Sequence, residues 1–362
     1  MNRLRWLTLA LILFLPGMLR ADEPDVRREI SFPDVAGYRI LACDLHMHTV
    51  FSDGDVWPTV RVKEAWRQGL HALAITDHIE YQPHKQDLPT NHNRPFELAA
   101  GAASGHNILL VKGAEITRDT PPGHFNALFL KDVKPLETKD LLDVIRNAHE
   151  QGAFVVWNHH NWHGPEKGRW LDVHTTLYEN KWLQGMEICN GDDYYPDAHT
   201  WCLDKKLTML GASDIHAPDL RRKSASGEHR TMTLVLVNER TAAGLKEALL
   251  AGRTVVWCKE QLIGQEEWLR PLFDSCVQIA KPHLRTKKAI FVEVKNVGQA
   301  DIHLEREGKT GPVRLTLPAH STSLLQIGAA DTTRPVQQKY VAANFIVAPK
   351  RSLEVTLTIP GP

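Results

Sequence analysis

The sequence predicts an α/β fold, in the form of a barrel of parallel strands, followed by a small all-β domain. Short β-rich runs alternate with helical patterns from about residue 30 to residue 260, which is typical of a parallel sheet. These runs end repeatedly in polar residues, and a closed barrel places its chemistry at the carboxyl ends of its strands. After Pro282 the helical patterns stop and short alternating or apolar runs follow one another. A chain of 362 residues is also long for one core.

The first residues are predicted to be a secretory signal peptide spanning 1–21. Two arginines precede about ten mostly apolar residues, Trp6 to Leu15, and the small Ala21 stands just before an acidic pair. A membrane span needs ~20 apolar residues, so we expect no stable membrane anchor, with a short anchor as the alternative. The mature protein is therefore expected in the periplasm or outside the cell, after cleavage near Ala21.

The barrel is predicted to occupy residues 30–265. A hydrophobic stretch from Tyr38 is its first strand, and the later strands are expected at 72–78, 108–115, 153–159, 185–190 and 207–216. Helices are expected at 59–68 and 139–151, the second closed by a glycine. Residues 82–107 are predicted to be a long irregular loop. The β-rich, sandwich-like domain is expected at 283–362, with strands near 289–295, 313–317, 323–327 and 353–359.

Composition excludes some classes of partner. Lysine plus arginine equals aspartate plus glutamate at 43 each, so the chain has no electrostatic footprint for nucleic acid. Nineteen histidines are the unusual feature of the composition.

The five cysteines form no CxxC pair, and buried free thiols are favoured over the single disulfide that an exported protein could also form.

Potential metal ligands gather at the predicted strand ends. In "CDLHMHTVFSDG" (43–54) two histidines stand two apart and therefore share one face of an extended chain. Such a pair alone is a weak indication of a metal site. Its weight increases because histidines and carboxylates recur at one edge of the barrel: His46, His48, Asp53, His78, Glu115, His124, His159, Asp214 and His216.

These motifs resemble the PHP (polymerase and histidinol phosphatase) family. The matching segments are DLHMHTVFSDG, AITDH, KGAEIT, PGHFNALF, FVVWNH and GASDIH, in the family's order. The resemblance implies a distorted (β/α)7 barrel that binds two or three divalent ions. It implies three ligand groups: His46, His48, Glu115 and Asp214; Glu115 again with His124 and His159; and Asp53, His78 and His216.

The longer segments FSDGDVWPTVRVKEAW, DHIEYQPHKQD and NGDDYYPDAHTW resemble the exported, Sb-PDE-like phosphodiesterases of this family. That likeness implies hydrolysis of phosphodiesters, in which a metal-bridging hydroxide is the nucleophile. Three divalent ions bring +6 and the three ligand carboxylates −3, so the site suits a small anionic phosphoester. Imidazole and carboxylate ligands without thiolate are compatible with manganese, zinc and iron.

Other residues are candidates for handling the substrate. Arg118 has the guanidinium geometry that binds phosphate, and Arg94 is a second such candidate; a surface salt bridge is the alternative for both. His160 stands where the family often has proline, and we expect it to reach the substrate or carry a proton. His84 is a candidate for protonating the leaving alkoxide, with ordinary loop placement as the alternative. Asp44 and Asp77 are expected to orient ligand histidines rather than bind metal, with a buried, hydrogen-bonded aspartate as the alternative for both. Six aromatic residues flank the ligand segments and either line a pocket or pack between layers: Trp57, Tyr81, Trp157, Trp162, Tyr194 and Tyr195.

Two alternatives to an exported phosphodiesterase remain. One is a phosphomonoesterase acting on a nucleotide or sugar phosphate. The other is a barrel that keeps metals for stability and binds a partner without catalysis. The full ligand set favours an enzyme over this non-catalytic alternative.

Overall fold

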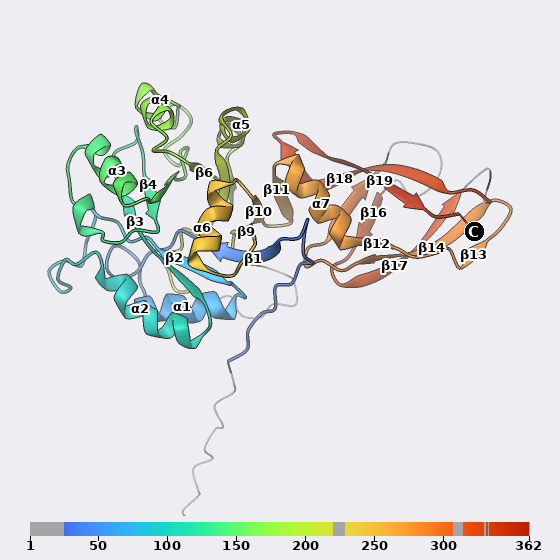
Figure 1. Ribbon diagram of the computed structural model, residues 1–362, viewed down its shortest axis with the longest axis horizontal. Helices are drawn as coiled ribbons and strands as arrows, with labels where there is room; N and C mark the ends of the chain where they lie inside the picture. Colours follow the sequence, from blue (N-terminus) through green and yellow to red (C-terminus); the bar gives the residue numbers. More distant parts are fainter. Residues whose placement is uncertain (1–24, 220–228, 307–313, 329–330, 332, 362) are drawn as a thin grey trace, which may run out of the picture.

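A computed structural model describes residues 25–219, 229–306, 314–328, 331 and 333–361. Figure 1 shows an elongated molecule with an α/β barrel at one end, a β-rich unit at the other and helix α7 (Glu266–Cys276) between them. The predicted signal peptide lies outside the described residues. Among the residues that are described, no helix is both long enough and apolar enough to cross a membrane.

Seven strands form the barrel. In order around it they are β1 (Arg39–Asp44), β2 (Ala72–Ile75), β3 (Leu109–Ile116), β4 (Phe125–Leu128), β5 (Phe154–Trp157), β6 (Gly185–Asn190) and β8 (Thr208–Ala212). All neighbours are parallel except β4, which runs antiparallel to β3 and β5. A parallel bridge between Met47 and Ile215 joins the segment after β8 to the segment after β1. The predicted fold class is confirmed, and the reversed β4 is its distortion.

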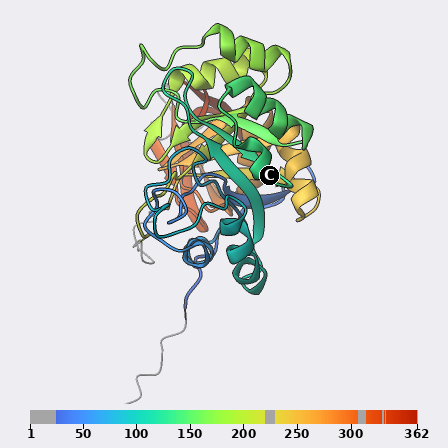
Figure 2. The ribbon, with the colours of Figure 1, turned by 90° about the vertical axis from the view of Figure 1, so that its left-hand side faces the viewer.

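Helices cover the outside of the barrel, as Figure 2 shows from the barrel's end. They are α1 (Pro58–Arg67), α2 (Arg94–Gly105), the 3-10 turn η1 (Lys134–Leu136), α3 (Leu141–Glu150), α4 (Asp172–Glu179), α5 (Pro196–Lys205) and α6 (Ala242–Leu250). α1 and α3 lie where helices were predicted.

The predicted irregular loop at 82–107 is wrong in its second half, because α2 occupies it. Pro95 stands in the helix's first turn, where its missing N–H costs nothing. The buried side chains Ala99 and Ala103 are small, so the hydrophobic period that reveals a helix is weak here.

Three further strands extend the sheet from β1 towards the C-terminal unit. They are β9 (Met232–Val237), β10 (Thr254–Cys258) and β11 (Gln261–Gly264), and successive members pair antiparallel. β11 then pairs in parallel with β18 (Val336–Ala348), where Leu262 lies opposite Phe345. The short β7 (Asp193–Tyr194) pairs with the end of β6.

The C-terminal unit is all-β, as predicted. One sheet is centred on β14 (Ala289–Asn296) and contains β12 (Val277–Ile279), β13 (Leu284–Arg285) and β17 (Ser321–Gly328). The other strands extend the large sheet through β18: β15 (Ile302–Glu305), β16 (Arg314–Leu317) and β19 (Arg351–Ile359). β19 alternates exposed and buried side chains, which shows that one face of this sheet covers the core.

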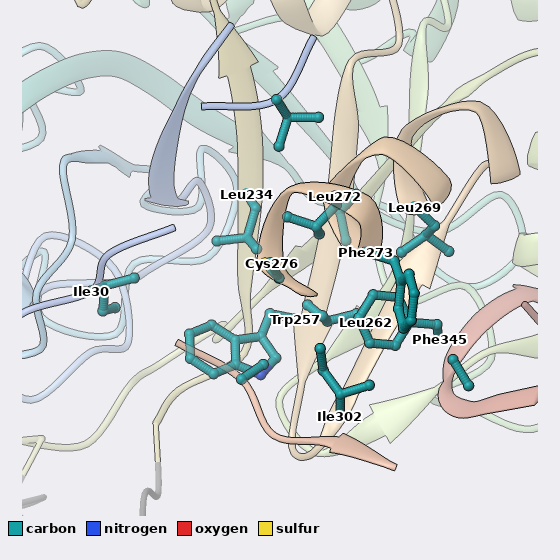
Figure 3. Close-up of a cluster of buried hydrophobic side chains, with 14 of the residues drawn as sticks. Ile30, Leu234, Trp257, Leu262, Leu269, Leu272, Phe273, Cys276, Ile302 and Phe345 are labelled. Atoms are coloured by element: carbon teal, nitrogen blue, oxygen red, sulfur yellow. The ribbon is translucent and has the colours of Figure 1, made fainter. Parts of the chain in front are cut away.

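A shared hydrophobic core joins the two parts (Figure 3). Leu269 and Phe273 of α7 are buried in the same cluster as Trp257 of the barrel sheet, and the Phe273 and Phe345 rings meet edge to face at 5.8 Å. The β unit is therefore packed against the barrel. All five cysteines are buried and unbridged, as favoured from the sequence.

Candidate metal centre

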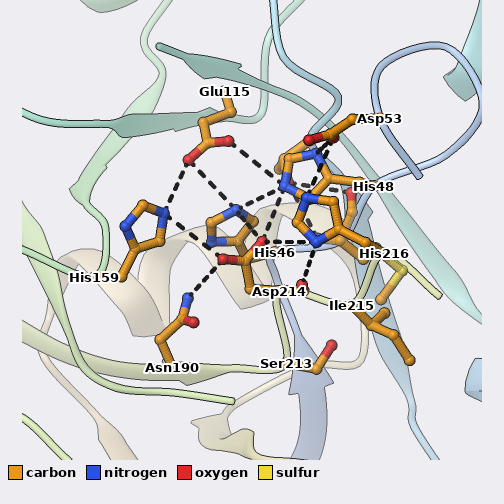
Figure 4. A network of polar contacts seen from close by, with 12 residues as sticks. His46, His48, Asp53, Glu115, His159, Asn190, Ser213, Asp214, Ile215 and His216 are labelled. Atoms are coloured by element: carbon orange, nitrogen blue, oxygen red, sulfur yellow. Dashed lines mark hydrogen bonds and ion pairs between the residues drawn. The ribbon is translucent and has the colours of Figure 1, made fainter. Parts of the chain in front are cut away.

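The segment after β1 places His46 and His48 in the middle of the site (Figure 4). Their Nε2 atoms lie 3.1 Å apart. Both face Oδ1 of Asp214, at 3.1 and 3.0 Å respectively. Asp214 follows β8 with a φ of 50°, and its N–H donates to the His46 carbonyl. This backbone contact between two strand extensions holds the carboxylate against the histidine pair.

Glu115, near the end of β3, reaches two groups of ligands. Its Oε1 lies 3.2 Å from Nδ1 of His124 and 3.3 Å from Nε2 of His159. Its Oε2 lies 3.5 Å from Nε2 of His48. The side chain is fully buried, so one carboxylate stands between the His46–His48 pair and the His124–His159 pair.

Asp53 is the centre of the third group. Its Oδ1 lies 3.2 Å from Nε2 of His216 and 3.5 Å from Nε2 of His78. The ring of His48 stacks on those of His78 and His216, at 4.4 and 4.2 Å between centroids. All nine residues predicted to bind metal are therefore brought together around Asp214, Glu115 and Asp53. They form four overlapping groups rather than the three expected, because His46, His48, His78 and Glu115 each belong to two of them.

The donor atoms fit divalent metal ions. Asp53 Oδ1, Glu115 Oε2 and Asp214 Oδ1 are buried and accept no hydrogen bond, although imidazole nitrogens surround them. Buried carboxylate oxygens normally find a donor, so oxygens and ring nitrogens that converge in this way are typical of a cation site. Imidazole and carboxylate ligands suit zinc, manganese and iron.

The electrostatics favour ionised carboxylates. Burial raises the pKa of Glu115, but the charges of His78 and His46 outweigh it and hold that pKa well below its usual value. Burial likewise opposes ionisation of Asp53, yet the neighbouring imidazoles of His216 and His78 keep its pKa lowered. Burial lowers the pKa of His78, while Glu115 and Asp53 raise it to about 10. Since a ligand histidine must be neutral, metal binding here is coupled to proton release.

A second layer of side chains supports the ligands, and sequence reasoning missed it. Oε1 of Glu187, on β6, lies 2.7 Å from Nδ1 of His46. Its Oε2 accepts the backbone N–H of His159 and an amide N–H of Asn190. A carboxylate on Nδ1 places the histidine proton there and leaves the Nε2 lone pair for an ion. Nδ2 of Asn158 donates to Glu115 Oε1 at 2.8 Å.

Arg61 of α1 ties two ligand segments together. Its guanidinium is fully buried and donates to the carbonyls of His48, Ile215, His216 and Ala217. The same side chain pairs with Glu64 at 2.8 Å. The sequence offered one indication of this role, because Arg61 lies in a helix that directly follows the ligand motif.

Asp44 and Asp77 make no direct hydrogen bond to a candidate ligand histidine among the described contacts, so both match the alternative of a buried, hydrogen-bonded aspartate. Asp44 accepts hydrogen bonds from the N–H and hydroxyl of Ser213 and pairs with the buried Arg230. Asp77 accepts from Thr49 and from the hydroxyl of Ser52. Asp44 anchors the chain beside Asp214, whereas Asp77 also holds Ser52, whose hydroxyl lies 3.2 Å from Nδ1 of His48.

The three residues predicted to handle substrate are placed differently from one another. Arg118 lines a pocket beside the ligands, but its guanidinium pairs with Glu80 and donates to two backbone carbonyls, those of Thr117 and Thr138. His160 is 3% exposed; its ring packs among Trp157, Tyr195 and Trp201, and Nδ1 donates to the Gly168 carbonyl at 2.7 Å. The structure therefore turns the His160 ring away from the ligand groups.

His84 is exposed in the loop before α2 and lines a separate small pocket. The structure does not bring it to the ligands. Arg94 pairs with Glu97 on the surface of α2, which is the alternative foreseen for it.

A pocket of about 580 Å³ opens beside the ligands that surround Glu115 and Asp53. Its lining includes Asp53, His78 and His124, so it leads directly to the candidate metal centre. The six aromatic residues that flank the ligand segments do not all belong to this pocket. Tyr81 and Trp162 line it, whereas Trp157 and Tyr195 are buried in the barrel's outer layer.

Comparisons with known proteins agree with this architecture. The PHP domain model matches residues 44–189, and an Ig-like domain model matches residues 277–358. An uncharacterized protein of Methanocaldococcus jannaschii is 33% identical over 78 residues, which are 22% of this chain and 34% of that protein. The match thus spans about a third of that curated relative's length.

A solved structure matches far more of the chain. It is a two-domain protein containing a predicted PHP-like metal-dependent phosphoesterase, from Bacteroides vulgatus, and it is 44% identical. The match covers 93% of this chain and 100% of that one, with a TM-score of 0.88. With this relative aligned over its whole length and the PHP model matching the barrel's ligand segments, the chain belongs to the PHP domain family.

Proposed function

We propose that the protein is a metal-dependent phosphoesterase that hydrolyses small phosphodiesters. The observation that carries this proposal is the convergence of nine ligand side chains, three of them with buried carboxylate oxygens lacking a hydrogen bond, at the end of an open pocket. The Bacteroides vulgatus relative contains a predicted metal-dependent phosphoesterase, which supports the reaction class.

Charge supports a centre of three ions. Asp53, Glu115 and Asp214 face the ions and Glu187 lies directly behind them, which makes four carboxylates and a charge of −4. Two divalent ions would only cancel this charge. Three would leave +2, and a net positive site attracts an anionic ester.

Divalent ions bound at such a centre lower the pKa of a water molecule towards ~7 and stabilise charge on phosphoryl oxygens. The chain's own part is to fix the ligands before substrate arrives. Glu187 and Arg61 hold the segments that carry His46, His48 and His216, and the His46 and His48 side chains are fully buried. Rigid ligands of this kind avoid reorganisation during the reaction.

The pocket favours a diester over a monoester. A monoester is a dianion near neutral pH and calls for additional cations. Of the arginine and lysine that line this pocket, the Arg118 guanidinium is already paired with Glu80, which leaves Lys167 to meet the second charge. A diester carries a single negative charge and two organic arms, and the exposed rings of Tyr81 and Trp162 offer apolar contacts for such arms. The likeness of the longer motifs to Sb-PDE-like phosphodiesterases points the same way.

Turnover of bis-p-nitrophenyl phosphate and of p-nitrophenyl phosphate tests this proposal. Both are assayed after loading the mature protein with manganese, zinc or iron. We expect faster turnover of the diester with at least one metal. Preference for the monoester would support the phosphomonoesterase instead. Stoichiometric metal binding without any hydrolysis would support the non-catalytic alternative.

We also propose that the chain is exported and cleaved near Ala21. Two arginines, a short apolar run and a small residue before acidic ones support this proposal. N-terminal sequencing of protein from the native cell should recover a form that begins near Asp22 outside the cytoplasm. Recovery of Met1 from a membrane fraction would instead indicate an anchor.

A further inference from the structure

Two half-exposed aromatic rings stand beside the candidate metal centre. Among the described residues, the strongly exposed aromatic side chains are Trp57, Tyr81 and Trp162, and two of these three line the same pocket. Tyr81 and Trp162 are each 53% exposed. Large rings left in water at one pocket mark a binding surface more often than scattered ones do.

The two rings lie next to different ligand histidines. The Trp162 ring is 5.7 Å from His124 and 5.9 Å from His159. The Tyr81 ring is 6.0 Å from His78, which shares a group of candidate ligands with Glu115 and His124 and another with Asp53. A phosphoryl group held at these ligands would have both aromatic side chains near it.

Trp162 is held in place although it is exposed. Its Nε1 donates to Thr120 Oγ1 at 3.3 Å, and its backbone N–H donates to the His159 carbonyl at 3.1 Å. It lies at the start of loop 161–168, whose far end also contributes Lys167 to the pocket.

His160 ties down the far end of that loop. Its buried Nδ1 donates to the Gly168 carbonyl at 2.7 Å, and the ring is enclosed by Trp157, Tyr195 and Trp201. A Cβ at residue 168 would lie 2.4 Å from the His160 carbonyl oxygen, so only glycine permits this approach. The residue that stands where the family often has proline therefore fixes a loop at the pocket.

We infer that Trp162 and Tyr81 form a ring-binding surface which holds a planar, ring-bearing organic arm of the phosphoester substrate, and that His160 is the positioning residue that keeps loop 161–168 in place for it. The inference rests on the proposed phosphoesterase function, and it adds the substrate class: esters with an aromatic or similarly flat group on at least one arm. Stacking on a fixed ring selects for such an arm without a specific hydrogen bond.

Binding is the first test, because it does not depend on turnover. Calorimetry on the metal-loaded protein compares diphenylphosphinate with dimethylphosphinate, two monoanions that differ in their rings and have no ester bond to hydrolyse. We expect tighter binding of diphenylphosphinate. Trp162→Leu or Tyr81→Leu should weaken it by about three- to tenfold and change dimethylphosphinate by less than about twofold. The matched control is Trp57→Leu, an exposed aromatic outside the pocket, which should change neither affinity.

Turnover is the second test. Bis-p-nitrophenyl phosphate and methyl p-nitrophenyl phosphate share one leaving group and differ in the second arm. The ratio of kcat/KM for bis-p-nitrophenyl phosphate to kcat/KM for methyl p-nitrophenyl phosphate should fall by about three- to tenfold in Trp162→Leu. The change should come mainly from a higher KM for the bis-p-nitrophenyl ester. Metal content should not change.

His160 is tested by a pair of variants. His160→Leu removes the donor to Gly168 and should reproduce the loss of ring preference seen in Trp162→Leu. His160→Asn keeps a donor near the same position and should recover part of that preference. A purely structural role would lower thermal stability in His160→Leu without moving the ratio between the two esters, and that outcome would remove His160 from the inference.

The inference as a whole is overturned if the wild-type protein binds both phosphinates equally, or if Trp162→Leu leaves the preference intact. The exposed Trp162 and Tyr81 variants decide this even if His160→Leu does not fold. If no diester is hydrolysed but ring-dependent binding persists, the proposed phosphodiesterase fails and the ring-binding surface stands.

Discussion

Nδ1 of His46 lies 2.7 Å from Oε1 of Glu187, and both side chains are buried. Oε2 of the same carboxylate accepts the backbone N–H of His159 at 2.9 Å. Glu187 thus controls the orientation of one ligand directly and the position of a second through its backbone. Two donors are thus served by the two oxygens of one carboxylate, whereas a glutamine of the same length would offer a single acceptor oxygen.

Replacing Glu187 should weaken metal binding before it affects folding. Carboxylate partners of ligand histidines are typically worth 10- to 100-fold in metal affinity, so Glu187→Ala should lower affinity by about that factor. Competition with a chelator, followed by metal analysis, measures the change. Glu150→Ala, at an exposed position near the end of α3, is the control and should bind metal like the wild type. Unchanged affinity in Glu187→Ala would contradict the orienting role.

Glu115 and Asp53 should differ in the number of ions that they hold. Glu115 lies between two ligand groups, whereas Asp53 belongs to one. Glu115→Gln should therefore lose more metal per chain than Asp53→Asn, which should lose a single ion. Elemental analysis of the purified variants gives both numbers. Equal stoichiometry in the two variants would show that Glu115 is not shared.

The same ions should stabilise the fold, because their ligands come from several strands and an ion that binds only the folded chain adds RT ln(1 + [L]/Kd) to the free energy of unfolding. Chelation should lower the thermal midpoint of the wild type. It should lower that of Glu115→Gln by less, because that variant begins with fewer ions.

The gathering of the nine candidate ligands could be predicted because most of them stand at or just past a strand end, where local pattern and topology agree. Asp53, well beyond the end of β1, could be placed only through its family motif. The role of Glu187 could not be predicted. This residue lies within the apolar run of β6, and its role depends on a contact with His46, which is 141 positions earlier in the chain. His160 was misread for a related reason: its neighbour His159 turns towards the ligands, and the adjacent ring takes the opposite side. Helix α2 was missed because alanines, rather than large apolar residues, form its buried face.

Arg118 was expected to bind phosphate, but its contacts with Glu80, Thr117 and Thr138 indicate that it holds the segment after β3 in place. Glu80 also accepts the backbone N–H of Thr117 at 2.7 Å. The effects of Arg118→Ala and Glu80→Ala on kcat/KM for a diester should therefore overlap, so that the double variant is no worse than the more affected single variant.

Direct binding of phosphate by Arg118 makes a different prediction. Arg118→Ala alone would then lower kcat/KM by roughly ten- to a hundredfold, through loss of a charge-assisted hydrogen bond worth ~1.5–3 kcal/mol. Glu80→Ala would leave the rate unchanged or raise it by freeing the guanidinium. Measuring the full cycle, with metal content checked in each variant, separates the two roles.

His174 should make the protein sensitive to acid. Its ring is fully buried and stacks on Trp157 at 3.7 Å. Nδ1 accepts the backbone N–H of Leu171 and Nε2 donates to the Pro122 carbonyl, so the neutral ring uses both nitrogens. Burial lowers its pKa to about 4, against a weaker opposing effect of the Pro122 carbonyl.

The sign of the effect follows from the two states. Above pH ~6.5 the histidine is neutral in both the folded and the unfolded chain and contributes no pH dependence. Between ~6.5 and about 4 only the unfolded chain takes up the proton, so the free energy of unfolding falls as the pH falls. The fall in the free energy of unfolding is complete below pH 4. It would then reach about 3 kcal/mol, at roughly 1.4 kcal/mol per pKa unit.

Urea unfolding of the wild type and His174→Gln at several pH values measures this contribution. The variant should be less stable at neutral pH, because it loses the packed ring, but its stability should fall less steeply between pH 6.5 and 4. Other groups that titrate in this range, including the metal ligands, are common to both proteins and cancel in the difference. His84→Gln, in an exposed loop, should retain the wild-type slope. Parallel slopes for the wild type and His174→Gln would mean that the folded protein already accepts a proton on this ring, and that the two hydrogen bonds of the neutral form do not persist in solution.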